Sequence, residues 1–323
     1  MRYGLAEVAR RAGVSPATAS RVLSGAGPAS AASRAAVLAA AQQLGYQPHP
    51  VARQLARKTG TRIVFAVRDN RADILRDPFV TRATTAMAAA LDPYDVGVSL
   101  RHLGLDCAAD LERLSADRGL AGLVLAGHDR ELLGHLPAGL RGRTAAIGAG
   151  GADVDSAAGV GALISRLHAV GRRRIALIAG PSWLAASAAP VGAYLRLVRA
   201  AGLRARIVRG DFTSDRGGAA ARAILTRWPD TDAIAAVSDA TALGALGALA
   251  AAGVRVPDDV AVTGFDDIPL AGTACPALST ATHPVEEIAA AAARAALGEA
   301  VPRRLFPSVP VFRDTCGGSA STA

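Results

Sequence analysis

Residues 5–25 read LAEVARRAGVSPATASRVLSG and decide the fold of the first part of the chain. Apolar residues stand at positions 5, 8, 9 and 12, the spacing of one helix face, which predicts a helix over residues 5–12. Gly13 can take the left-handed conformation that ends a helix. Ser15 and Pro16 then offer an N-cap and a proline at the first helical position of a second helix. Two short helices across a glycine turn are typical of a helix-turn-helix.

The second predicted helix, residues 17–23, has an apolar face and a polar face. The helical spacing turns Ala19, Val22 and Leu23 inward and leaves Ala17, Thr18, Ser20 and Arg21 outward. Small hydroxyl groups suit contacts with phosphate, and an arginine can donate two hydrogen bonds to the edge of a guanine. A third helix is predicted over residues 30–45, with Ser30 and Ser33 as candidate caps.

The positive charge of the chain is concentrated at its start. Residues 1–60 hold eight Arg and Lys side chains against one acid, Glu7, so +7 of the net charge of +9 lies there and the other 263 residues carry +2. This distribution indicates a small nucleic-acid-binding module joined to a nearly neutral body. A basic face that is merely solvated is the alternative, and composition alone leaves it open.

Length and composition exclude several classes of protein. A chain of 323 residues has room for two or three domains, and 51% hydrophobic residues with 20% charged residues suit globular ones. We expect no secretory leader and no membrane-spanning helix, because no apolar segment follows the first basic residue and no run of about 20 apolar residues exists. Three distant cysteines favour a reducing cytoplasm and indicate neither a disulfide framework nor a metal site.

The rest of the chain repeats an α/β pattern. Strands are predicted in two series of four, at 62–67, 96–100, 121–126 and 143–148, and then at 174–179, 205–208, 233–237 and 260–265. Helical stretches separate them, which predicts two parallel sheets covered by helices. Residues 278–281 and 309–312 are expected to cross back between the two lobes. Such a body binds ligand in the cleft at the carboxyl ends of its strands.

These patterns predict an all-α helix-turn-helix domain followed by a two-lobed α/β body. We expect the DNA-binding domain over residues 1–47, a short basic hinge helix and linker over 48–60, the body over 61–315 and a tail over 316–323. Within the body, lobe one is expected to comprise about 61–155 and 283–308, and lobe two about 156–282 and 309–315.

Residues 5–25, the later run LGYQPHPVARQLA at 44–56, and the order of the body resemble the LacI/GalR family of bacterial transcription repressors over essentially the whole chain. Stretches 171–181, 251–271 and 276–292 carry the resemblance through the body. It implies a periplasmic-binding-protein type I body and a homodimer on a pseudo-palindromic double-stranded DNA operator. It also implies control by a small-molecule effector in the cleft, with no cofactor.

The resemblance implies that the second helix enters the major groove and that the hinge helix enters the minor groove. The implied DNA contacts are Leu5, Ser15, Pro16, Ala17, Thr18, Ser20, Arg21, Ser30, Arg53 and Leu55. Leu55 is the residue that wedges into a base step, and burial against the body is its alternative. For Arg21 the alternative to a base contact is a phosphate contact.

The effector contacts implied by the resemblance are Phe79, Ser238, Asp239, Phe265, Asp266 and His283. Two alternatives remain: Asp266 can cap a turn, and Phe79 can belong to the core. Sugar- or purine-binding members carry an arginine where this chain has Pro190, and an acid near Gly148, so we expect a pocket depleted in polar anchors and do not assign a sugar.

Two rival functions are weaker. Six scattered histidines show neither metal spacing nor a neighbouring nucleophile, which argues against an enzyme. A periplasmic solute receptor would share the body fold, but the basic helix-turn-helix and the missing leader argue against it. The sequence does not indicate the operator, the effector or the sign of its effect, and a dimer is expected because no C-terminal heptad repeat is visible.

Overall fold

The structure is a computed structural model that describes residues 5–24, 29–44, 46, 60–299 and 305–317. The N-terminal head consists of α1 (Leu5–Arg11), α2 (Pro16–Ser24) and α3 (Ala31–Gln43). The three helices pack pairwise around one small apolar core, which contains Val8, Ala9, Ala19, Val22, Val37, Ala40 and Ala41. The helix-turn-helix and the third helix expected from the sequence are therefore confirmed.

The turn between the first two helices forms as its residues predict. Gly13 adopts φ 65°, a conformation that a residue with a Cβ atom rarely takes. Ser15 then accepts a hydrogen bond from the backbone N–H of Thr18 at 3.1 Å and so caps α2. These two local devices fix where α1 ends and α2 begins.

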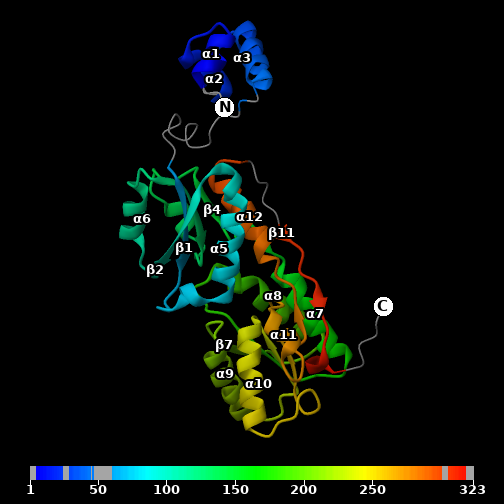
Figure 1. Ribbon diagram of the computed structural model, residues 1–323. Helices are drawn as coiled ribbons and strands as arrows, with labels where there is room; N and C mark the ends of the chain where they lie inside the picture. Colours follow the sequence, from blue (N-terminus) through cyan, green and yellow to red (C-terminus); the bar gives the residue numbers. More distant parts are fainter. Residues whose placement is uncertain (1–4, 25–28, 45, 47–59, 300–304, 318–323) are drawn as a thin grey trace.

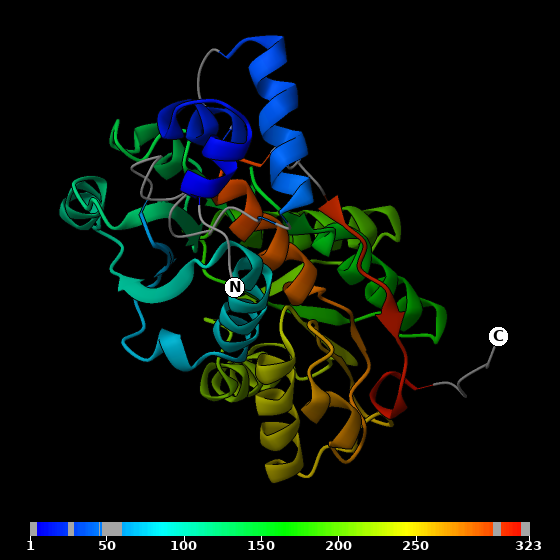
Figure 2. The same ribbon diagram turned by 45° about the horizontal axis from the view of Figure 1, so that its top comes forward.

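Lobe one is built on a parallel sheet with the strand order β2-β1-β3-β4. The strands are β1 (Arg62–Arg68), β2 (Gly97–Leu103), β3 (Leu120–Ala126) and β4 (Thr144–Ala146). Helices α5 (Pro78–Leu91) and α12 (Val285–Ala296) run side by side over one face of the sheet in both views (Figure 1, Figure 2). The other face packs with α6 (Ala108–Ser115) in a separate leucine-rich cluster.

Lobe two repeats this arrangement with the strand order β7-β6-β8-β9. The strands are β6 (Ile175–Ala179), β7 (Arg206–Arg209), β8 (Ala233–Ala236) and β9 (Ala261–Thr263). One face packs against α9 (Ser214–Arg227) and α10 (Asp239–Ala251), which lie in contact with each other. The other face is covered by α7 (Ser156–Ala169) and α8 (Ala188–Ala200), and α11 (Pro269–Thr273) follows β9.

Short strands connect the two lobes. β5 (Asp153–Val154) pairs in parallel with β11 (Leu305–Phe306), and β10 (Thr280–Ala281) pairs in antiparallel with β12 (Pro310–Val311). Short 3-10 turns complete the chain at Ile74–Arg76, Asp92–Tyr94, Leu132–His135, Ala185–Ser187 and Asp314–Cys316. The sheets and crossings agree with the predicted α/β body, and the domain limits themselves stay a prediction.

Two details differ from the expectation. The last strand of lobe two ends at Thr263, because the chain leaves the sheet in a turn where Asp266 and Asp267 adopt φ 116° and 48°. The tail does not begin at residue 316, because Cys316 lies in a 3-10 turn and is buried in the core of the body.

Candidate nucleic-acid interface and effector pocket

The polar face of α2 carries most of the predicted DNA contacts on one surface. Ser15, Pro16, Ala17 and Arg21 are exposed, and Thr18 and Ser20 are half-buried. The hydroxyls of Ser15 and Thr18 lie 2.9 Å apart at the start of the helix. Backbone N–H groups at a helix start attract anions, so this end of α2 is suited to a phosphate. Arg21 extends from the same face, one turn after Ala17, whose carbonyl accepts a hydrogen bond from its Nε at 3.2 Å.

The remaining predicted DNA contacts have other surroundings. Leu5 is half-buried and packs against the core of the head. Ser30 is exposed, and its hydroxyl accepts a hydrogen bond from the N–H of Ser33 at 3.1 Å, so Ser30 is the one of the two candidate caps that caps α3. Arg53 and Leu55, together with the expected hinge helix, lie outside the described residues.

A cavity of about 230 Å³ lies between the two lobes of the body. Its lining comes from the ends of β1 and β3, the start of α5, the loop after β6, the start of α10 and the turn after β9. The cavity therefore lies where the carboxyl ends of both parallel sheets face each other, as the α/β rule requires. It is smaller than the roughly 300 Å³ of the smaller ligand pockets in proteins.

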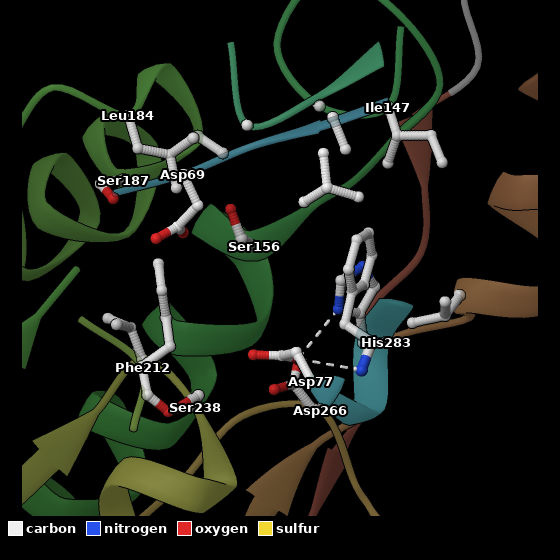
Figure 3. A pocket seen from close by; sticks show the side chains of 18 of the residues that line it. Asp69, Asp77, Ile147, Ser156, Leu184, Ser187, Phe212, Ser238, Asp266 and His283 are labelled. Carbon is white, nitrogen blue, oxygen red and sulfur yellow. Dashed lines mark hydrogen bonds and ion pairs between the residues drawn. The ribbon is translucent and has the colours of Figure 1, made fainter. Parts of the chain in front are cut away.

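Five of the six predicted effector contacts line this cavity: Phe79, Ser238, Phe265, Asp266 and His283. His283 Nδ1 and Asp266 Oδ1 lie 2.9 Å apart (Figure 3). The His283 ring stacks on Phe79 with 5.8 Å between centroids and a 26° interplanar angle, and Phe265 lies at the same distance, tilted by 55°. The cluster joins the start of α5 in lobe one to the turn after β9 in lobe two.

Asp239 does not line the cavity, and its prediction as an effector contact is wrong. Its side chain is fully buried behind Ser238, where it accepts hydrogen bonds from Thr280 Oγ1 at 2.6 Å and from the N–H of Ile268 at 2.9 Å. Burial, and then the negative charge of Asp266, raise the pKa of Asp239 to about 7. Ser238 faces the cavity and also caps α10 through the N–H of Thr241.

The expectation of a pocket depleted in polar anchors is wrong for lobe one. Arg71 Nε donates to Asp69 Oδ1 at 3.2 Å and its NH groups donate to Asp77 Oδ2 at 3.4 Å, and all three residues line the cavity. Pro190 and Gly148 also line it and, as expected, supply no side-chain donor. The anchors come instead from the loop after β1, which has no periodic pattern that could have revealed them.

Sequence reasoning missed other lining residues as well, namely His128, Asp153, Ser156, Trp183, Ser187 and Phe212. Trp183 lies under the guanidinium of Arg68, 5.6 Å from its ring centroid, and so joins a lobe-two loop to a lobe-one strand end. Isolated polar and aromatic residues in loops carry no local signal. Only the stretch that follows each predicted strand marks where such residues should be sought.

Within the described residues, no cluster of three His, Cys, Asp or Glu side chains is placed to hold a metal ion. The helices of these residues include none that is long and apolar enough to cross a bilayer.

The head and the two-lobed body together define a DNA-binding regulator with a ligand-binding body. A family model described as bacterial regulatory proteins of the lacI family matches residues 4–49, and one described as a periplasmic-binding-protein-like domain matches residues 164–316. The transcriptional regulator CelR of Thermobifida fusca is 34% identical over 307 residues, which cover 88% of each chain. The regulator MalR of Streptomyces coelicolor is 31% identical and covers 93% of this chain and 90% of its own.

Solved structures agree with these relatives. A CelR–cellobiose complex superposes with a TM-score of 0.67 at 30% identity, covering 97% of this chain and all of that one. A lac repressor dimer bound to operator and an anti-inducer has the same fold, with a TM-score of 0.70 at 24% identity, covering 98% and 99%. The chain therefore belongs to the LacI family. It is a transcriptional regulator with a DNA-binding helix-turn-helix, and the expectation that it is not an enzyme is confirmed by these relatives.

Proposed function

We propose that this regulator binds a pseudo-palindromic operator as a homodimer, and that a small molecule in the interlobe cavity controls this binding. The observation that carries the proposal is the exposed polar face of α2 on a basic head, joined to a body with a cavity at the carboxyl ends of both sheets. A cytoplasmic location, where the operator lies, is part of the same proposal. The domain limits expected from the sequence, apart from the start of the tail, belong to the same proposal.

The DNA contacts proposed are those on and around α2. Ser15 and Thr18 hold phosphate at the start of the helix, and Arg21 reads a base pair in the major groove. The test is selection of bound sequences from a random pool of duplex DNA. Two half-sites with a fixed spacing are expected, because a two-fold dimer presents two copies of α2. Failure to bind any duplex at low salt would refute the proposal.

A homodimer is supported by apolar surface on the body. Leu270, Leu305, Val309 and Phe312 are large apolar side chains and are exposed. Leu305, Val309 and Phe312 all lie within residues 305–312, and exposed apolar side chains that gather on a surface favour a protein interface. The double variant Leu270→Ser and Val309→Ser should therefore form more monomer in analytical ultracentrifugation, whereas Leu100→Ser, an exposed position on β2, should not. An unchanged dimer in the double variant would place the interface elsewhere.

The proposed effector contacts are Phe79, Ser238, Phe265, Asp266 and His283. The other lining residues, which the sequence did not reveal, complete the wall of the cavity. The carboxylate of Asp266 can accept hydrogen bonds from ligand hydroxyls, and the flanking rings can stack on a ligand ring. CelR is a relative whose solved complex contains cellobiose. A hydroxylated ligand is accordingly proposed here, and a change in operator affinity when it is added is the measurement that tests its role.

A further inference from the structure

The interlobe cavity has more negative than positive charge in its wall. Its charged lining consists of the carboxylates of Asp69, Asp77, Asp153 and Asp266 and the guanidinium groups of Arg68, Arg71 and Arg82. Arg68 pairs with Asp129 at 2.9 Å and Arg82 with Glu286 at 2.7 Å, and neither of these acids lines the cavity. Four carboxylates then face one remaining guanidinium.

The lining guanidinium groups are also occupied as hydrogen-bond donors. Arg71 donates to both Asp69 and Asp77. Arg68 donates to the carbonyls of Leu105 and Gly127, and Arg82 donates to Glu286 and the carbonyl of His283. An anionic ligand would have to displace these acceptors, so the wall does not suit a phosphate or a carboxylate ligand.

Asp153 is the lining carboxylate without a cation. Among the described residues its only hydrogen bond comes from the N–H of Val154 at 2.9 Å, and no ion pair reaches it. Burial raises the pKa of Asp153, and the hydrogen bond from the N–H of Val154, followed by the nearby His283 and His128, offsets this only in part. A half-buried carboxylate without a cation would be stabilised by a cation that arrives with a ligand.

Two deeply buried polar atoms of the wall have no hydrogen-bond partner among the described residues. They are Ser187 Oγ, on a residue 6% exposed, and His128 Nδ1, on a residue 3% exposed. Ser187 points into the cavity (Figure 3). His128 Nε2 lies 2.8 Å from the carbonyl of Ala149, which assigns the ring hydrogen to Nε2 and leaves Nδ1 as an acceptor. Unsatisfied buried groups are costly, so a ligand with hydroxyl groups matches both atoms.

We infer that the cavity takes a single hydroxylated ring that carries a protonated amine, an amino sugar, with its ammonium group on Asp153 and its hydroxyls on Ser187 and His128. The volume of about 230 Å³ suits one ring, and the aromatic groups of the wall can stack on its apolar face and attract its charge. This inference rests on the proposed function, since it names the chemical class of the effector at that site.

Isothermal titration of the full chain with matched sugars tests the inference. The probes are glucosamine, N-acetylglucosamine and glucose, together with galactosamine, N-acetylgalactosamine and galactose. The titrations are carried out at about pH 6.5, where the amine of an amino sugar is protonated. In at least one series the amino sugar should bind about 10-fold tighter than both neutral partners, because a hydrogen bond to a charged group outweighs a neutral one. The inference is overturned if a neutral member binds equally well or better in both series, or if none of the six binds with a Kd below about 10 mM.

Asp153→Asn keeps an acceptor for the N–H of Val154 and removes only the charge. It should abolish the preference for the amino sugar, so that the ratio of the dissociation constants falls to about one. Asp110→Asn removes a half-buried carboxylate on α6 that pairs with Arg113, outside the cavity, and should leave the ratio unchanged. A preference retained in full by Asp153→Asn contradicts the assignment. Operator binding without sugar is measured in parallel. If the protein binds its operator but shows no preference for the amino sugar, only this inference fails. If the protein does not bind DNA, the proposed function fails.

Discussion

The buried carboxylate of Asp239 should make the stability of the body depend on pH. Its two oxygens are held by Thr280 Oγ1 and the N–H of Ile268, and none of its side chain is exposed. Asparagine has the same shape and can preserve both contacts, with its oxygen on Ile268 and its amide donating to Thr280 Oγ1. Asp239→Asn therefore removes the charge and little else.

The magnitude follows from the pKa of Asp239, about 7 in the folded protein against 3.8 in the unfolded chain. Below about pH 4 both states hold the proton, and above about pH 7 both have lost it. Between these limits the folded state keeps a proton that the unfolded state releases, so stability falls as the pH rises. The total loss is about 4 kcal/mol, of which about 2–3 kcal/mol falls between pH 5 and pH 8.

Equilibrium urea denaturation at pH 5 and pH 8 measures this loss. The wild-type protein should lose about 2–3 kcal/mol more than Asp239→Asn over this interval, and the variant should be the more stable of the two at pH 8. Asp110→Asn, which alters a half-buried carboxylate paired with Arg113, should keep the wild-type dependence. Equal losses in wild type and Asp239→Asn would show that Asp239 is ionised in the folded protein over the whole interval.

Three further substitutions test the head, the body and the cavity. Arg21→Ala should cost about 1–3 kcal/mol at the selected operator in fluorescence anisotropy and relax the preference at one base pair, whereas an equal loss on random DNA would make it a phosphate contact. Tyr194→Phe should cost about 1–3 kcal/mol in urea denaturation, because its buried hydroxyl donates to Ile175 O at 2.8 Å and accepts from the N–H of Arg206 at 2.7 Å. Phe79→Leu keeps apolar volume but loses the ring that stacks on His283. Sugar binding should therefore weaken roughly 2- to 10-fold, with little change in melting temperature. A large drop in melting temperature with unchanged sugar binding would place Phe79 in the core.

The head could be predicted closely because its signals are local. The helix face of Val8 and Ala9, the positive φ of Gly13 and the cap at Ser15 all act within one or two turns of helix. The strands could also be placed, since each is a short apolar run between helices. Their ends were less predictable: β9 stops at Thr263 because the following turn needs positive φ at two aspartates. Aspartate is typical of turns, but it does not fix the residue at which the strand ends.

The cavity was harder to predict because neighbours in sequence point in different directions. Ser238 and Asp239 are adjacent, yet one lines the cavity and the other is buried behind it. The pairing of Arg71 with Asp69 and Asp77 depends on the path of the loop after β1, which no periodicity reveals. The resemblance to the LacI/GalR family identified residues at strand ends. The two cavity-wall atoms without a hydrogen-bond partner among the described residues, Ser187 Oγ and His128 Nδ1, could be recognised only from the structure.

An effector can shift the arrangement of the lobes only through contacts that differ between arrangements. In this structure the two lobes meet where the N–H of Ala185 donates to His128 O at 3.3 Å. His128 belongs to the loop after β3 in lobe one, and Ser187 ends the 3-10 turn before α8 in lobe two. A ligand that bonds both His128 Nδ1 and Ser187 Oγ holds the lobes in this arrangement, and it would lose one bond if they separated. That one bond contributes about 0.5–1.5 kcal/mol, which overlaps the lower part of the roughly 1–3 kcal/mol typical of coupling between an effector and a distant site.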